Sequence, residues 1–188
     1  MKIYITGASC AGVTTLGSML AKKCAIRHVD VDDFYWLPTD PPYTQKRPPE
    51  QRVQLIKARL DTTSWVLTGS FDGWGDALIE DADLIVFVLT PHDVRMSRLM
   101  AREPERYGDR ILPGGDMHDN HRAFANWASQ YEAPGPGHAG RSLPRHESWL
   151  ALQTLPVLRV DGARRVDELV QTVIQTGERL VNPGASAR

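Results

Sequence analysis

The sequence of 188 residues lacks several features that mark whole classes of protein. Its two cysteines, Cys10 and Cys24, form no C-x-x-C pair and are too few for a disulfide framework. No apolar run reaches the length of a transmembrane helix, and the first residues resemble a strand instead of the apolar part of a signal peptide. We therefore expect a cytoplasmic protein that keeps its thiols reduced and does not act at a membrane.

The sequence also lacks an excess of charge of one sign, with 22 Lys and Arg against 23 Asp and Glu. A balanced charge creates no overall field that attracts nucleic acid or anionic lipid, so neither is an expected partner. The length suits one domain with a sizeable core. We predict that this domain spans residues 1–181 and that a flexible tail follows at 182–188.

Short apolar runs alternate with helical patterns along the chain, which predicts an α/β fold with a parallel sheet between helical layers. One of these runs, Leu84–Leu89, is apolar on both faces, as is typical of a central strand. In such sheets ligands bind beyond the carboxyl ends of the strands, so we expect the functional residues in the loops there. The runs are Ile3–Thr6, Ile26–Val29, Trp65–Thr68, Leu84–Leu89 and Pro156–Val160.

The loop after the first predicted strand carries the most specific motif, a match to the phosphate-binding P-loop G-x-x-x-x-G-K-[ST]. Both glycines and the threonine are present, but the lysine position holds Val13. Backbone N–H groups and the helix dipole give most of the grip on a phosphate, so we predict nucleotide binding with weakened turnover. The alternative is a glycine turn without a ligand. The predicted phosphate-binding residues are Gly7, Ala8, Ser9, Cys10, Ala11, Gly12, Val13, Thr14 and Thr15.

Three aspartates, Asp30, Asp32 and Asp33, follow the second predicted strand. Side chains alternate along an extended chain, so Asp30 and Asp32 are expected on one side. A carboxylate near the hydroxyl of Thr14 can hold Mg²⁺, and a second one can orient or deprotonate an acceptor hydroxyl. We predict that Thr14 and Asp32 bind the metal ion and that Asp30 and Asp32 are catalytic residues. The alternative is a solvated turn.

A segment stiffened by prolines, Trp36–Arg47, follows these aspartates and ends in two cations. We predict that it forms one wall of an acceptor pocket, in which Arg47 meets an anionic group. A packed surface loop is the alternative, equally compatible with the residues. The predicted acceptor-binding residues are Asp33, Tyr35, Arg47 and, from the loop after the third strand, Ser70.

The helix expected after the fourth strand is rich in arginine on one face. We predict Thr90 as its N-cap, Pro91 as its first residue and an end near Tyr107. One or two of its arginines are expected to clamp a phosphate, replacing the cation missing at Val13. A solvated face paired with neighbouring glutamates is the alternative. The face carries Arg95 and the three predicted catalytic arginines, Arg98, Arg102 and Arg106.

Taken together, these motifs resemble the small P-loop kinases that include adenylate, shikimate and gluconate kinases. A closer similarity is to a bacterial group described as adenylate-kinase-like or AAA-family ATPase-like. The resemblance covers most of the chain and implies a five-stranded sheet in the order 2-3-1-4-5, ATP as the donor, Mg²⁺ and a mobile lid at about 107–146. Its motifs are Val29–Trp36, Pro38–Tyr43, Thr68–Ser70 and Arg102–Glu103.

We therefore expect a kinase, monomeric or homodimeric, that transfers the γ-phosphoryl group of ATP to a small molecule or a nucleotide. If the acceptor is a hydroxyl, Asp32 or Asp33 is the base; if it is a nucleoside monophosphate, Arg47 becomes the clamp. The alternative is a nucleotide-binding regulatory module with little activity, because Val13 breaks the kinase pattern. Replacement of Val13 by lysine distinguishes these possibilities.

Overall fold

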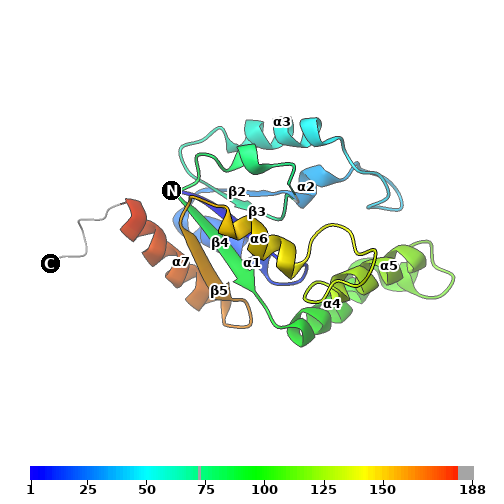
Figure 1. Cartoon of the computed structure of the whole chain (residues 1–188). Coiled ribbons are helices and arrows are strands. Elements are labelled where there is room, and N and C mark those ends of the chain that lie inside the picture. Colours follow the sequence, from blue (N-terminus) through cyan, green and yellow to red (C-terminus); the bar gives the residue numbers. More distant parts are fainter. Residues whose placement is uncertain (72, 182–188) are drawn as a thin grey trace.

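The computed structural model describes residues 1–71 and 73–181 (Figure 1). Asp72 and the tail predicted at 182–188 lie outside the described residues. Within the described part, five parallel strands form one sheet in the order β2-β3-β1-β4-β5, which confirms the predicted order. Each predicted strand end lies within one residue of the observed end. The strands are β1 (Lys2–Gly7), β2 (Arg27–Asp30), β3 (Trp65–Thr68), β4 (Leu84–Leu89) and β5 (Val157–Asp161).

Helices cover both faces of the sheet, as Figure 1 shows with α3 and α7 on opposite sides. The sheet and helices therefore form the predicted three-layer α/β sandwich. In chain order the helical segments are α1 (Val13–Cys24), α2 (Asp32–Tyr35), α3 (Pro49–Leu60), η1 (Asp76–Leu78), α4 (His92–Tyr107), η2 (Gly108–Ile111), α5 (His118–Ser129), α6 (Leu143–Ala151) and α7 (Val166–Val181).

Alternation along β1 divides the core into two clusters. Ile3 and Ile5 are fully buried on the face covered by α1 and α7, where they join Leu16 and Val173 in one apolar cluster. Tyr4 points to the other face, into a cluster that includes residues of α3 and α6. Burial of apolar side chains on both faces fixes the register of this central strand. Its carboxyl end, where Gly7 begins the phosphate loop, is thereby held in place.

The start of α4 corrects one expectation. Pro91 occupies the N-cap position, and no side chain of the described residues caps the helix. The Thr90 hydroxyl instead donates a hydrogen bond to the carbonyl oxygen of Ala11, at 2.8 Å. Thr90 is therefore not the N-cap, because its hydroxyl is used by the phosphate loop. The helix ends at Tyr107, as predicted.

No helix in the described ranges is long and apolar enough to cross a membrane.

Candidate phosphate and acceptor site

The loop between β1 and α1 has the backbone of a phosphate cradle. Gly12 adopts a left-handed conformation with a φ of 99°, and Cys10 does so with a φ of 60°. The N–H of Leu16 bonds to the carbonyl of Gly12 at the start of α1, and within the part of the chain that the structure describes no side chain caps this end. The preceding N–H groups of the first turn have no acceptor within the helix, so they are available to an anion.

Side chains from other parts of the chain hold the carbonyl groups of this loop. Arg95 donates to the carbonyl oxygen of Ser9 at 3.3 Å. The carbonyl oxygen of Ala11 accepts from Thr90 and, at 3.3 Å, from Arg98. Because these carbonyls are already bonded to donors, the loop is preorganised before any ligand arrives.

Val13 lies within the apolar core, with only 8% of its surface exposed. One of its methyl groups would lie 3.2 Å from a Cβ placed on Gly7, and the carbonyl of Val88 would lie at 2.6 Å from the same Cβ. Gly7 is therefore required by the close packing of β1 against β4. At position 13 the sequence has an apolar contact where the P-loop pattern has a cation.

The metal-binding group predicted from the sequence is partly assembled. The hydroxyl of Thr14 donates to the carboxylate of Asp30 at 2.7 Å, which joins the phosphate loop to the end of β2. The other oxygen of Asp30 accepts from the backbone N–H of Asp32 at 3.0 Å. Asp30, and not Asp32, therefore lies beside Thr14. Oxygen ligands of this kind suit Mg²⁺.

Asp32 and Asp33 have different surroundings, although both residues are exposed. Desolvation by surrounding protein raises the pKa of Asp32, and Asp30 and Asp33 raise it further, while Arg141 and Arg102 oppose the rise. Desolvation and Asp30 also raise the pKa of Asp33, which is opposed by His28. Asp32 is thus the carboxyl that lies within the field of arginines from α4 and from the loop before α6.

The arginines of α4 face the phosphate loop but do different things there. Desolvation raises the pKa of the Cys10 thiol in this loop. Arg102, Arg95 and Arg106 oppose that rise, so their positive charges lie near the loop. Arg95 is 1% exposed and is bound by Glu132 at 2.6 Å. Arg98 also donates to the carbonyl of Gly162 at 2.9 Å, so it links the phosphate loop to the turn after β5.

The remaining two arginines, Arg102 and Arg106, differ in their surroundings. Arg102 pairs with the buried carboxylate of Glu103 at 2.6 Å. Arg106 is exposed and is close enough to Cys10 to influence the pKa of its thiol. Arg98 therefore acts as a support for the loop, whereas Arg102 and Arg106 make no hydrogen bond to the loop carbonyls among the described residues.

A second part of the site is a cavity of about 130 Å³ at the carboxyl ends of β1 and β3. Ser70, one of the predicted acceptor-binding residues, lines it together with Thr6, Arg141 and His146. Ser70 and His146 contact each other at 3.2 Å although 76 residues separate them in sequence. Of these four residues, the sequence interpretation identified only Ser70. The others lacked a recognisable motif.

Tyr35 and Arg47 are not among the residues that line this cavity. The guanidinium of Arg52 lies 3.9 Å from the centre of the Tyr35 ring. Arg47 donates from its side chain to the carbonyl of Phe34 at 3.1 Å. The structure thus places Tyr35 and Arg47 in packing contacts of the Trp36–Arg47 segment, apart from the cavity.

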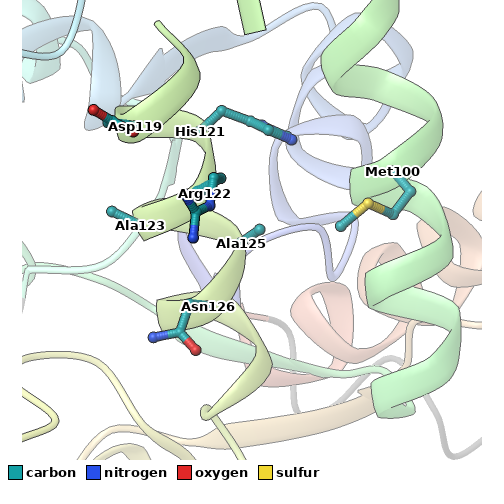
Figure 2. Close-up of a pocket in the computed structure, with 7 residues that line it drawn as sticks. All are labelled: Met100, Asp119, His121, Arg122, Ala123, Ala125 and Asn126. Carbon is teal, nitrogen blue, oxygen red and sulfur yellow. The ribbon is translucent and has the colours of Figure 1, made fainter. Parts of the chain in front are cut away.

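A larger and more open cavity, of about 600 Å³, lies between α4 and α5. Figure 2 shows His121 reaching from α5 toward α4, and Met100 reaching back from α4. The lining includes no residue of the phosphate loop and none of the three aspartates. This groove is therefore separate from the site that Thr14 and Asp30 define.

The sequence is 40% identical over 173 residues to "Uncharacterized protein YqaC" of Bacillus subtilis (strain 168), and the match covers 92% of this chain and 94% of the relative. The chain belongs to the YqaC family. No family model matches the sequence.

Solved structures give this YqaC-family chain the fold of the small P-loop kinases. A shikimate kinase from Bacteroides thetaiotaomicron superposes with a TM-score of 0.58 at 17% identity, over 95% of this chain and 98% of that one. A gluconokinase from Sinorhizobium meliloti 1021 superposes with a TM-score of 0.56 at 16% identity, over 97% of this chain and 94% of that one. At such identities the likeness concerns the fold.

The kinase fold implies ATP and Mg²⁺ as ligands, and the residues of the YqaC-family chain are of the kinds that could hold both. The left-handed Gly12 and the uncapped start of α1 leave backbone N–H groups for phosphate oxygens. The adjacent oxygens of Thr14 and Asp30 form a donor set that suits Mg²⁺. The lysine that normally reaches the outer phosphates has no counterpart at Val13.

Proposed function

We propose that this protein is an ATP-dependent kinase that transfers the γ-phosphoryl group to a small-molecule acceptor. The hydrogen bond of 2.7 Å between Thr14 and Asp30 carries the proposal, because it joins a hydroxyl of the phosphate loop to a carboxylate of the next strand. A glycine turn without a ligand has no need for this pairing. The cavity at Ser70, on the same edge of the sheet, supplies the place for an acceptor.

In the proposed reaction an acceptor hydroxyl attacks the γ-phosphorus. The bond from that phosphorus to the bridging oxygen breaks, ADP leaves, and the hydroxyl proton passes to a carboxylate. Asp32 is the preferred base over Asp33, because Arg141, which lines the cavity at Ser70, acts on the charge of Asp32, whereas the charges that act on Asp33 are those of Asp30 and His28.

Thr14 and Asp30 would hold Mg²⁺, which neutralises charge on the phosphates when bound. Arg102 and Arg106 add positive charge on the α4 side of the loop and stand in for the missing lysine. Positioning and charge neutralisation provide most of the catalysis in phosphoryl transfer. The proposed site therefore places its cations on a helix that lies beside the loop.

A catalytically weak regulatory module remains the second candidate, and one observation favours it. Among the described residues, both hydrogen bonds of the Arg98 guanidinium go to backbone carbonyls, those of Ala11 and Gly162. Arg98 thus supports the loop without replacing the lysine lost at Val13. In such a module, nucleotide binding would order the residues at about 107–146 without phosphoryl transfer.

Calorimetric titration with ATP, ADP and GTP, with and without Mg²⁺, tests the proposal. We expect micromolar binding of a nucleotide, stronger with Mg²⁺, and a loss of that Mg²⁺ dependence in Thr14→Ala. Thr62→Ala is a matched control, because the Thr62 hydroxyl donates to a backbone carbonyl in an exposed turn. If none of the nucleotides binds, both the kinase and the regulatory module are excluded.

Turnover separates the two candidates. ADP release that depends on an added acceptor and falls in Asp32→Asn supports the kinase. Nucleotide binding without acceptor-dependent ADP release, over a broad screen of hydroxyl compounds, supports the regulatory module.

A further inference from the structure

Glu103 is a carboxylate that the fold keeps out of water beside the phosphate loop. The residue lies in the second half of α4 and is 5% exposed. Desolvation raises the pKa of the Cys10 thiol, and the charge of Glu103 raises it further, so this carboxylate lies near the loop. A buried carboxylate needs a cation or hydrogen-bond donors that neutralise it. The state of α4 beside the loop therefore depends on which group pairs with Glu103.

Arg102 is the partner of Glu103 in this structure. Its Nε and Nη2 both donate to one carboxylate oxygen, Oε1, at 3.0 and 2.6 Å. Arg102 is also one of the two cations that the proposed function assigns to the phosphates of ATP. A phosphate that binds this guanidinium competes with Glu103 for the same N–H groups. If Arg102 turns to the phosphate, Glu103 loses the charge that neutralises it.

His121 of α5 lies opposite the second oxygen of Glu103. Its Nδ1 is 3.6 Å from Oε2, which is too long for a hydrogen bond. This Nδ1 is buried, and among the described residues it has no hydrogen-bond partner. Figure 2 shows the imidazole reaching from α5 toward α4. A movement of about 1 Å would bring Nδ1 within hydrogen-bond distance of Oε2.

His121 is also the group around Glu103 that can gain a proton near neutral pH. Burial raises the pKa of the Cys10 thiol and that of Tyr107, the latter to about 12, so both groups are neutral near pH 7. The arginines keep their charge. On α5, Asp119 and Arg122 line the groove beside His121, but both are exposed to water. The groups that face Glu103 among the described residues are Cys10 of the phosphate loop, Arg102, Arg106 and Tyr107 of α4, and His121 of α5.

We propose that Glu103 is a positioning residue with two alternative partners. It holds Arg102 while the phosphate loop is empty, and it pairs with a protonated His121 when Arg102 binds a phosphate. Glu103 thus exchanges one cation for another, and the proton comes from the solvent. Phosphate binding is then coupled to proton uptake and to closer packing of α5 against α4. That Arg102 binds a phosphate rests on the proposed function; that Glu103 can change partners does not.

Calorimetric titration with ATP and Mg²⁺, in buffers that differ in their enthalpy of ionisation, measures the proton uptake. At about pH 7.5 an ordinary histidine is mostly neutral, and we expect the wild type to take up about half a proton or more per ATP bound. His121→Gln should lack this uptake, and the difference between the two proteins cancels the protons that ATP itself exchanges. His118→Gln is the matched control, because the Nδ1 of His118, on the same helix, contacts the carbonyl of Ile111.

Glu103→Gln distinguishes the exchange from a merely structural role of Glu103. The amide carries no charge, so no buried carboxylate is left without a partner when Arg102 turns to a phosphate. We expect this variant to bind ATP at least as tightly as the wild type and to take up no proton through His121. A carboxylate that only held α4 and α5 together would instead weaken ATP binding when it is replaced. Thermal unfolding confirms that each variant is folded.

The exchange can also be observed without a nucleotide. Arg102→Met removes the first partner of Glu103, and His121 should then become its partner. In an NMR titration of the histidine side chains, we expect the His121 imidazole of this variant to lose its proton at a pH about one unit higher than in the wild type. Arg106→Met is the control for the loss of a nearby positive charge, and it should shift this titration less. The His121→Gln spectrum identifies the signal.

Either of two results overturns the inference: equal proton uptake in the wild type and His121→Gln, or an equal His121 titration in the wild type and Arg102→Met. The kinase proposal fails separately. If no nucleotide binds, that proposal is wrong, and the titration of His121 in Arg102→Met alone decides whether Glu103 changes partners. If ATP binds and is turned over with the same proton uptake in His121→Gln, the kinase proposal is supported and the exchange is wrong.

Discussion

The phosphate side and the acceptor side of this site are built in different ways. Residues 7–15 are contiguous, and other parts of the chain hold the carbonyls of Ser9 and Ala11. The cavity instead combines Thr6, Ser70 and His146 from distant segments. The first half depends on backbone conformation, and the loop adopts that conformation with Val13 in the lysine position. The second half depends on a few side chains, so single substitutions there should change which ligand is bound.

The largest effect is expected where the two halves meet. Asp30→Asn keeps an oxygen beside Thr14 but removes the charge, and we expect kcat/KM for ATP to fall by about 10²- to 10³-fold, as for the loss of one charge-stabilising group. Asp33→Asn, at an exposed neighbouring position, is the control, and its kcat/KM for ATP should fall by less than about 10-fold. Steady-state ADP release measures both. Equal losses would mean that the Thr14–Asp30 pair has no special role.

The acceptor side should be sensitive to pH. Because burial lowers the pKa of His146 to about 4, the unfolded chain takes up its proton more readily. The free energy of unfolding is therefore expected to decrease as the pH falls from about 6.5 to about 4, by about 3 kcal/mol for this group. Chemical denaturation of wild type and His146→Phe across this range checks the prediction. If both lose stability equally, His146 is not the group responsible.

The support of the phosphate loop can be tested without a ligand. Arg98→Met removes the donors to Ala11 and Gly162, and we expect a loss of about 2 kcal/mol in the free energy of unfolding. Arg106→Met changes an exposed arginine of the same helix and should alter stability by less than about 0.5 kcal/mol. Urea denaturation measures both. Similar values for the two variants would contradict the structural role of Arg98.

The smallest expected effect concerns the missing lysine. Val13→Lys places an ammonium group where 8% of the side chain is exposed, so we expect a loss of about 1–2 kcal/mol in stability and no gain in turnover. Val13→Ala is the control for lost packing alone. A rise in ADP release without a change in ATP affinity would contradict this and indicate a site that has lost its cation.

The sequence predicted the sheet well because local signals define it. Apolar runs mark all five strands to within one residue, and the P-loop spacing locates the phosphate loop and Thr14. Motifs that follow strands also predicted the meeting of Thr14 with the aspartate cluster, although the structure places Asp30 and not Asp32 beside it.

The cavity was less predictable, because its contacts are made across long stretches of chain. Nothing near Arg141 in the sequence indicates that it reaches the end of β1, and His146 meets Ser70 only after the chain has formed α4 and α5. Thr90 was misassigned for a related reason. A threonine before a proline suits a helix cap, but its hydroxyl bonds to Ala11 in a loop 79 residues away.

The contacts of the Ala11 carbonyl also bear on how the protein matures during synthesis. The phosphate loop leaves the ribosome before Thr90 and Arg98, which lie 79 and 87 residues after Ala11 and bind its carbonyl. Arg98 is in turn anchored on Gly162, beyond β5. Because the chain is synthesised from its N-terminal side, the supports of the nucleotide site are complete only after β5 and Gly162 have been made.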